Sequence, residues 1–118
     1  MADQSNYIND QGLSKFVGTN VATAVAGAAT LNAFAGQVTS ESLATAAGAT
    51  YTLTLTNSKI SASDLVFVSV DKAASTGTPA LAYATPGAGS VVIVIQNING
   101  ATAFNSSIKI AFIVMKTQ

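Results

Sequence analysis

Seven residues near the middle of the chain constrain its fold more than any others. Thr50–Thr56 reads T-Y-T-L-T-L-T, so threonine alternates strictly with large apolar side chains. Successive side chains of a β-strand point to opposite faces of the sheet, and this period of two therefore predicts a strand buried on one face only. Tyr51, Leu53 and Leu55 are predicted to face a core, and the threonines to face solvent or a neighbour.

The most apolar segment of the chain is C-terminal, Ser90–Lys116. Its two runs of β-branched residues, Val91–Ile95 and Ile108–Met115, are predicted to form the core pair of strands. Between them, Asn99–Gly100 is the dipeptide favoured by type I′ turns and predicts a tight reversal. A second turn signal at Asn105–Ser106 leaves open whether the segment is a simple hairpin.

Other short apolar runs complete the predicted fold. Strands are expected at Val38–Leu43, Leu65–Val70 and Ala80–Thr85, and Pro86–Gly89 is a turn because proline fixes φ and glycine permits positive φ. Turn signals recur at the spacing of roughly 8–12 residues that is typical of sandwiches and barrels. The sequence therefore predicts an all-β fold, an antiparallel β-sandwich that is jelly-roll-like in the broad sense, over residues 38–118.

Residues 1–37 are predicted to form an extended N-terminal arm and a linker. The first 20 residues have scattered apolar side chains that match neither strand nor helix periodicity. Two interpretations stand side by side: a disordered tail, or an arm that orders against a partner through these side chains. In the second, the partner-binding residues would be Tyr7, Ile8, Leu13, Phe16 and Val17. The Ala/Gly/Thr-rich stretch 21–37 is expected to be loosely extended, with a short helical turn at most.

Composition excludes several classes of function. The chain has no Cys and no His, so disulfides, thiolate metal sites and His-based nucleophilic catalysis are impossible. Charged residues make up only 8% and the net charge is zero, which argues against a nucleic-acid partner and a polybasic membrane anchor. The first residues lack the pattern of a signal peptide, and residues 21–35 are too weakly apolar to span a bilayer, so synthesis in a cytoplasm is expected.

The remaining motifs offer little chemistry. Asp64 and Asp71 lie at the two ends of one predicted strand, roughly 20 Å apart, which is too far for a pair of catalytic carboxylates. Adjacent Ser and Lys residues arise by chance in a chain so rich in serine, and Gly87-x-Gly89 is not followed by a helix as a phosphate-binding loop would be. No catalytic, cofactor-binding or metal-binding residue is therefore assigned, and no cofactor or small-molecule substrate is expected.

The C-terminal strands are apolar on both faces, which predicts association. Val92 and Val94 lie on the parity opposite to the rest of their run, as do Ala111 and Ile113, and these four residues are the predicted subunit interface. Either the N-terminal segment or a neighbouring subunit must cover them. Burying a few such side chains contributes several kcal/mol at ~25 cal/mol per Å2. A homo-oligomer, specifically a homotrimer, is expected.

Three segments resemble small structural modules of tailed-phage virions. They are S-L-A-T-A-A-G-A-T-Y-T-L-T-L-T-N-S at 42–58, T-P-G-A-G-S-V-V-I-V-I-Q-N at 85–97 and N-S-S-I-K-I-A-F-I-V at 105–114. The residues of these segments and their order along the chain are similar to those of capsid decoration (cement) proteins. Similar modules occur in tail fibres and tail tips.

This resemblance implies a trimeric β-sandwich without enzymatic activity. A decoration protein would bind the major capsid protein at local three-fold positions on the outer surface of the virion, after assembly in the host cytoplasm. The alternative is a tail-fibre or tail-tip receptor-binding module. Residues 1–41 lie outside the resemblance, and the short apolar-dotted arm favours decoration, with the arm as a capsid-facing staple.

Overall fold

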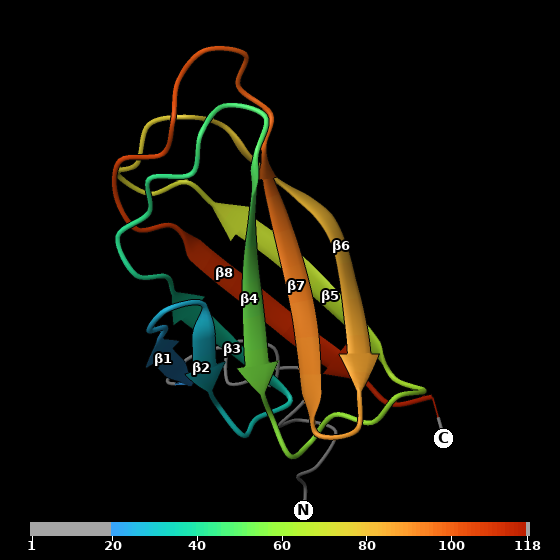
Figure 1. Ribbon diagram of the computed structural model, residues 1–118. Helices are drawn as coiled ribbons and strands as arrows, with labels where there is room; N and C mark the ends of the chain where they lie inside the picture. The colour runs from blue at the N-terminus through green and yellow to red at the C-terminus, as the bar shows by residue number, and fades with distance from the viewer. Residues whose placement is uncertain (1–19, 118) are drawn as a thin grey trace, which may run out of the picture.

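Two four-stranded β-sheets pack face to face in the computed structural model, which describes residues 20–117 (Figure 1). The described residues form no helix. The strands are β1 (Val21–Thr23), β2 (Ala28–Thr30), β3 (Ala35–Thr39), β4 (Thr50–Thr56), β5 (Leu65–Asp71), β6 (Pro79–Gly87), β7 (Ser90–Asn97) and β8 (Lys109–Met115). The predicted all-β sandwich is confirmed.

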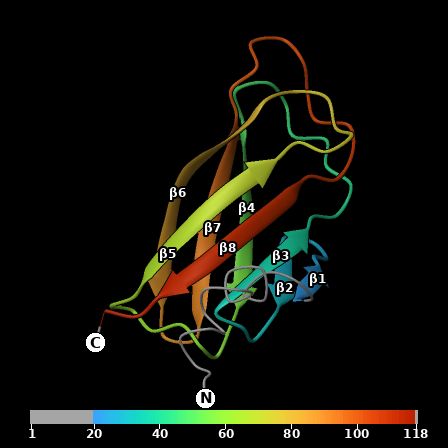
Figure 2. The same cartoon turned by 180° about the vertical axis from the view of Figure 1, so that it is seen from behind.

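Strand order follows the same plan in both sheets. One sheet has the order β1-β3-β8-β5 and the other β2-β4-β7-β6. The pairs β1–β3 and β2–β4 are parallel and all others are antiparallel, so the sheets are mixed rather than purely antiparallel. Seen from behind, β5, β8 and β3 lie in front of β4, β6 and β7 and run obliquely to them (Figure 2).

The core lies between the two inner faces. Tyr51, Leu53 and Leu55 of β4 are buried and the threonines between them are exposed, as the alternating pattern predicts. Opposite them in register stand Ile95, Ile93 and Val91 of β7. From the other sheet come Val38 of β3 and the inward side chains of β8, Ile110, Phe112 and Val114, all within the same buried cluster.

Strands β7 and β8 do not pair with each other. The C-terminal segment was expected to supply the core pair, but β7 belongs to one sheet and β8 to the other, and they face each other across the core. The connection at 98–108 therefore crosses between sheets instead of reversing tightly. Asn99 shapes this crossing because its Oδ1 accepts hydrogen bonds from the N–H groups of Ala101 and Thr102 at 2.9 and 2.8 Å.

The stretch 21–37 contributes strands to both sheets, whereas a loose linker was expected there. β1 and β2 each have three residues, and β3 begins at Ala35 rather than at Val38. Small residues suit this corner because the backbones approach closely. A Cβ on Gly27 would lie 2.8 Å from the backbone oxygen of Thr52, and one on Gly36 would lie 2.8 Å from that of Asn20. Ala and Gly here permit packing rather than flexibility.

Candidate functional site

Two charge-poor outer faces are the most distinctive surfaces of the described fold. The sheet β2-β4-β7-β6 contains no Asp, Glu or Lys at all. The sheet β1-β3-β8-β5 contains only Asp71 and Lys109, which stand opposite each other at one end of the β5–β8 pair. Charges normally cover the solvent-facing side of an antiparallel sheet, so both faces suit contact with another protein surface.

The outer face of β4, β7 and β6, here called the threonine face, carries mostly hydroxylated side chains. Its central residues are Val92 and Val94 of β7, each flanked on both sides in register. Val92 lies between Thr54 and Thr85 and is half-buried, whereas Val94 lies between Thr52 and Tyr83 and is only 6% exposed. Of these two predicted interface residues, Val92 is the more available to a partner.

The outer face of β5 and β8, here called the apolar face, exposes larger side chains. Leu65, Phe67, Ile113 and Met115 are 49, 54, 39 and 51% exposed. They form two cross-strand pairs, Leu65 with Met115 and Phe67 with Ile113. The predicted interface residues Ala111 and Ile113 both lie here, so the four predicted residues divide between opposite faces of the sandwich.

A shallow hollow of about 180 Å3 indents the apolar face. It exists because the next cross-strand pair beyond Phe67 and Ile113 consists of two small residues, Ser69 and Ala111. Lining it are Phe67, Val68, Ser69, Ala111, Phe112 and Ile113. Its volume lies below the roughly 300–1,000 Å3 of small-molecule pockets and suits a single large side chain.

Sequence reasoning missed Leu65 and Phe67 as surface residues. The signal was present, because Leu65–Val70 is apolar on nearly both parities. What it lacked was the register with β8, which decides that Phe67 points outward beside Ile113. The predicted arm residues Tyr7, Ile8, Leu13, Phe16 and Val17 lie outside the residues that the structure describes.

Three loops gather at the end of the sandwich opposite to the C-terminus (Figure 1). They join β3 to β4, β5 to β6 and β7 to β8. Asn97, fully buried at the end of β7, ties them together. Its Oδ1 accepts hydrogen bonds from the N–H groups of Thr78 and Asn99, both at 3.1 Å. Its Nδ2 donates to the carbonyl oxygens of Thr45 and Thr102 at 3.2 and 2.9 Å. This end of the molecule thus has a rigid base beneath exposed loop tips.

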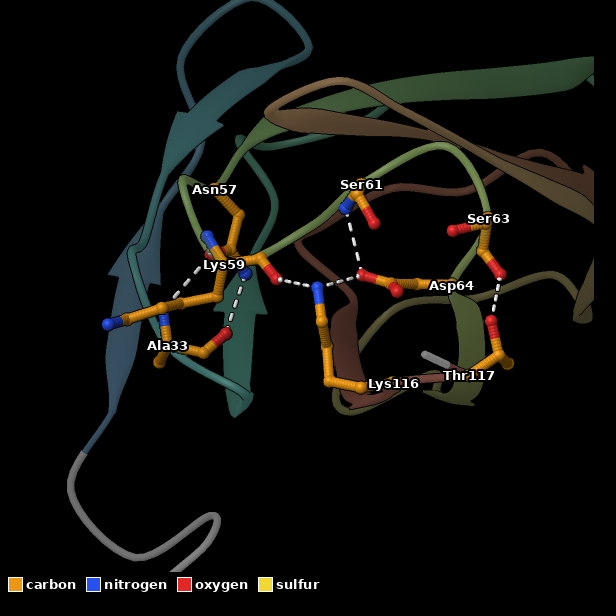
Figure 3. Close-up of polar contacts among 8 residues, drawn as sticks. All are labelled: Ala33, Asn57, Lys59, Ser61, Ser63, Asp64, Lys116 and Thr117. Atoms are coloured by element: carbon orange, nitrogen blue, oxygen red, sulfur yellow. Dashed lines mark hydrogen bonds and ion pairs between the residues drawn. The ribbon is translucent and has the colours of Figure 1, made fainter.

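At the other end, the C-terminus is attached to the loop before β5 (Figure 3). Lys116 Nζ lies 2.7 Å from Asp64 Oδ2 and donates to the carbonyl oxygen of Lys59 at 3.1 Å. The Asp64 side chain is only 2% exposed. The hydrogen bond from Lys116 lowers the pKa of Asp64, against the opposing effect of its desolvation. The pair acts as a structural clamp that joins the residues after β8 to the loop before β5.

A second buried polar contact joins β4 to the loop before it. Tyr51 Oη donates a hydrogen bond to Glu41 Oε1 at 2.8 Å. Burial of the phenol, and then its bond to this carboxylate, raise the pKa of Tyr51 far above its ordinary value. A phenol with so high a pKa stays protonated and serves as a donor that fixes the loop.

The acidic side chains of the described residues are dispersed over the fold. No group of three or more His, Cys, Asp or Glu side chains among residues 20–117 is placed to hold a metal ion. Asp64 and Asp71 lie at opposite ends of the β5 region, as expected, with Asp64 tied to Lys116 and Asp71 accepting from the N–H of Ala73 at 2.8 Å. The features that stand out among the described residues are therefore the threonine face and the apolar face with its hollow.

Within residues 20–117, no helix has the length and apolar character needed to cross a bilayer.

Comparisons with known proteins add no relative. No protein-family model, no curated protein and no solved structure was found to match the chain.

Proposed function

We propose that this protein is a non-enzymatic structural component of a virion, a capsid decoration (cement) trimer that binds the major capsid protein and stabilises the lattice from its outer surface. The observation that carries the proposal is the pair of outer sheet faces, which hold one Asp and one Lys between them. A charge-poor sandwich of this kind favours packing against other protein surfaces.

The edge strands give this proposal a second support. β1 and β2 have three residues each, and β6 has proline near both ends and a bulge between Leu81 and Tyr83. Short length, proline and bulges are the features by which proteins block edge pairing. β5 has none of them, with seven residues in regular register to β8. The β5 edge suits association, as do the faces that carry Val92, Val94, Ala111 and Ile113.

Electron microscopy of capsids tests the capsid assignment. Purified protein is mixed with expanded capsids of the tailed phage that encodes it, and negative-stain images are averaged around the local three-fold positions. Added density there is the expected result. A variant lacking residues 1–19 should remain folded but leave the capsids bare, because the proposed staple is gone. Unchanged decoration by this variant would rule out the arm as the staple.

A receptor-binding module of a tail tip is the second candidate. It is favoured by the loop cluster fixed beneath by Asn97, with Ile98 57% exposed beside it. Rigid scaffolds that present variable loops are a common arrangement for recognition. This candidate predicts that the isolated protein adheres to host cells and blocks infection, while capsids in the same preparation stay undecorated.

A further inference from the structure

The apolar face needs an occupant, and its dimensions restrict what that can be. Four side chains, each about half exposed, form it: Leu65, Phe67, Ile113 and Met115. At 150–250 Å2 for a whole large side chain, they offer roughly 400 Å2. A stable interface between two folded bodies buries about 800 Å2 on each partner. The face is thus too small to hold a second copy by itself, but a short attached segment needs much less area.

The chain itself supplies such a segment beside this face. Residues 1–19 precede Asn20, and Asn20 lies on the same sheet as the hollow. Its carbonyl oxygen accepts a hydrogen bond from the N–H of Gln37 at 2.9 Å, and its Nδ2 donates to the carbonyl oxygen of Ala35 at 3.1 Å. Ala35 is in register with Ile113, and Gln37 with Ala111, the two β8 residues that line the hollow.

Distances select the residue that can reach the hollow. From β1 across β3 and β8 to the gap between β8 and β5 is about 12 Å, at ~4.8 Å per strand. An extended chain covers ~3.3 Å per residue, so four residues allow Phe16 to reach a point up to about 13 Å from Asn20. That reach is enough to span the distance from Asn20 to the hollow. The hollow of about 180 Å3 accepts one large side chain, and Phe67 in its wall offers an aromatic partner.

We propose that the segment around Phe16 docks on the apolar face of its own chain, with the Phe16 ring in the hollow between Phe67, Ser69, Ala111 and Ile113. This divides the arm in two: its second half is fixed to the body, and Tyr7 and Ile8 remain for a partner. It also gives Ala111 and Ile113 an occupant from the same chain, which leaves Val92 and the threonine face for subunit contact.

Cross-linking tests the docking directly, because the chain has no Cys of its own. A Ser14→Cys/Ser69→Cys double variant places one thiol on the side of the extended arm to which Phe16 points, and the other in the hollow. Under mild oxidation we expect both thiols to disappear into a bond within a single chain, detected by mass and by non-reducing electrophoresis. The matched control, Ser14→Cys/Thr54→Cys, places the second thiol on the threonine face and should keep both thiols free within the chain. Bonds formed between chains, or equal bonding in both variants, would overturn the proposal.

Limited trypsin digestion provides a second measurement that leaves the arm sequence intact. Docking shields the Lys15–Phe16 bond, so Phe67→Ala should speed cleavage there by about tenfold, the effect of losing one large apolar contact. Phe67 is 54% exposed in the described fold, and its truncation should leave the body folded. Cleavage after Lys72, in an exposed loop at the far end, serves as the internal control. Equal rates after Lys15 in both proteins would contradict docking. Neither readout depends on capsid binding or on trimer formation.

Discussion

Asn57 and Asn97 occupy matching positions at opposite ends of the antiparallel pair β4–β7, and both are fully buried. Asn57 follows β4, and its N–H donates to the carbonyl oxygen of Gly89 just before β7. Asn97 ends β7, and its N–H donates to the carbonyl oxygen of Ala49 just before β4. Each side chain then bonds to backbone groups of more distant loops. The two amides thus close the two ends of the sandwich.

Removing the Asn97 amide should destabilise the fold strongly. Asn97→Ala leaves four backbone partners without their hydrogen bonds at a buried site, and we expect a loss of about 3 kcal/mol in the free energy of unfolding. Urea titration followed by circular dichroism measures it. Asn105→Ala is the matched control, because Asn105 is exposed and accepts one bond, from the N–H of Thr76. Asn105→Ala should lower the free energy of unfolding by less than about 1 kcal/mol. Equal losses in the two variants would refute the role of Asn97.

Two glycines with nearly the same backbone conformation should respond differently to alanine. Gly48 and Gly77 have φ of +80° and +83°, where a Cβ costs about 1 kcal/mol. Around Gly48 the space is open, but a Cβ on Gly77 would lie 2.7 Å from the Phe104 ring and 3.1 Å from the Asn97 side chain. We expect Gly77→Ala to cost at least about 2 kcal/mol more than Gly48→Ala in thermal or urea unfolding. Similar costs would mean that Phe104 and Asn97 yield without penalty.

The Lys116–Asp64 clamp should make stability depend on acid pH. The pKa of Asp64 is lower in the fold than its ordinary 3.8, chiefly through the bond from Lys116. A depressed folded pKa gives stability that is present above the ordinary value and is lost as pH falls through the folded value. Melting temperatures measured from neutral pH down to below the ordinary value should therefore fall, and Asp64→Asn should flatten part of that fall. Lys116→Gln should reduce the same part of the fall in melting temperature. The Asp64→Asn/Lys116→Gln double variant should reduce it no further than either single variant.

Most of the strands were predictable from the sequence, but their arrangement was not. The alternating Thr50–Thr56 pattern predicts both bounds of β4, because one face is buried and the other is exposed. β1 and β2 escaped prediction because three Ala, Val and Thr residues give no measurable period. The partners of β7 and β8 depend on long-range pairing, which the local Asn99–Gly100 turn signal does not determine.

The candidate surfaces were likewise predictable only in part. In β7 and β8, both odd and even positions are apolar, which indicated that some apolar side chains face outward. Val92 and Ile113 are two that do. Their availability depends on cross-strand neighbours: Tyr83 and Thr52 cover Val94, whereas small Ser69 and Ala111 leave a hollow beside Ile113. Register sets these neighbours, and it appears in no single segment of the sequence.

A charge placed on the threonine face should disrupt subunit contact. Val92 is half-buried between Thr54 and Thr85 on a face that carries no charge. In the proposed trimer, Val92→Lys would bury an unpaired ammonium group, which is unfavourable. The monomer tolerates it because a lysine on that face reaches solvent. Ala88→Lys adds the same charge at the exposed tip of the β6–β7 turn and should leave assembly unchanged.

Sedimentation velocity of the unmodified protein at micromolar concentration tests the central claim of a self-associating structural module most directly. We expect a single species of three times the 11.8-kDa chain, which Val92→Lys converts to the mass of one chain. A monomer at that concentration in the unmodified protein, with the fold intact by circular dichroism, would contradict it.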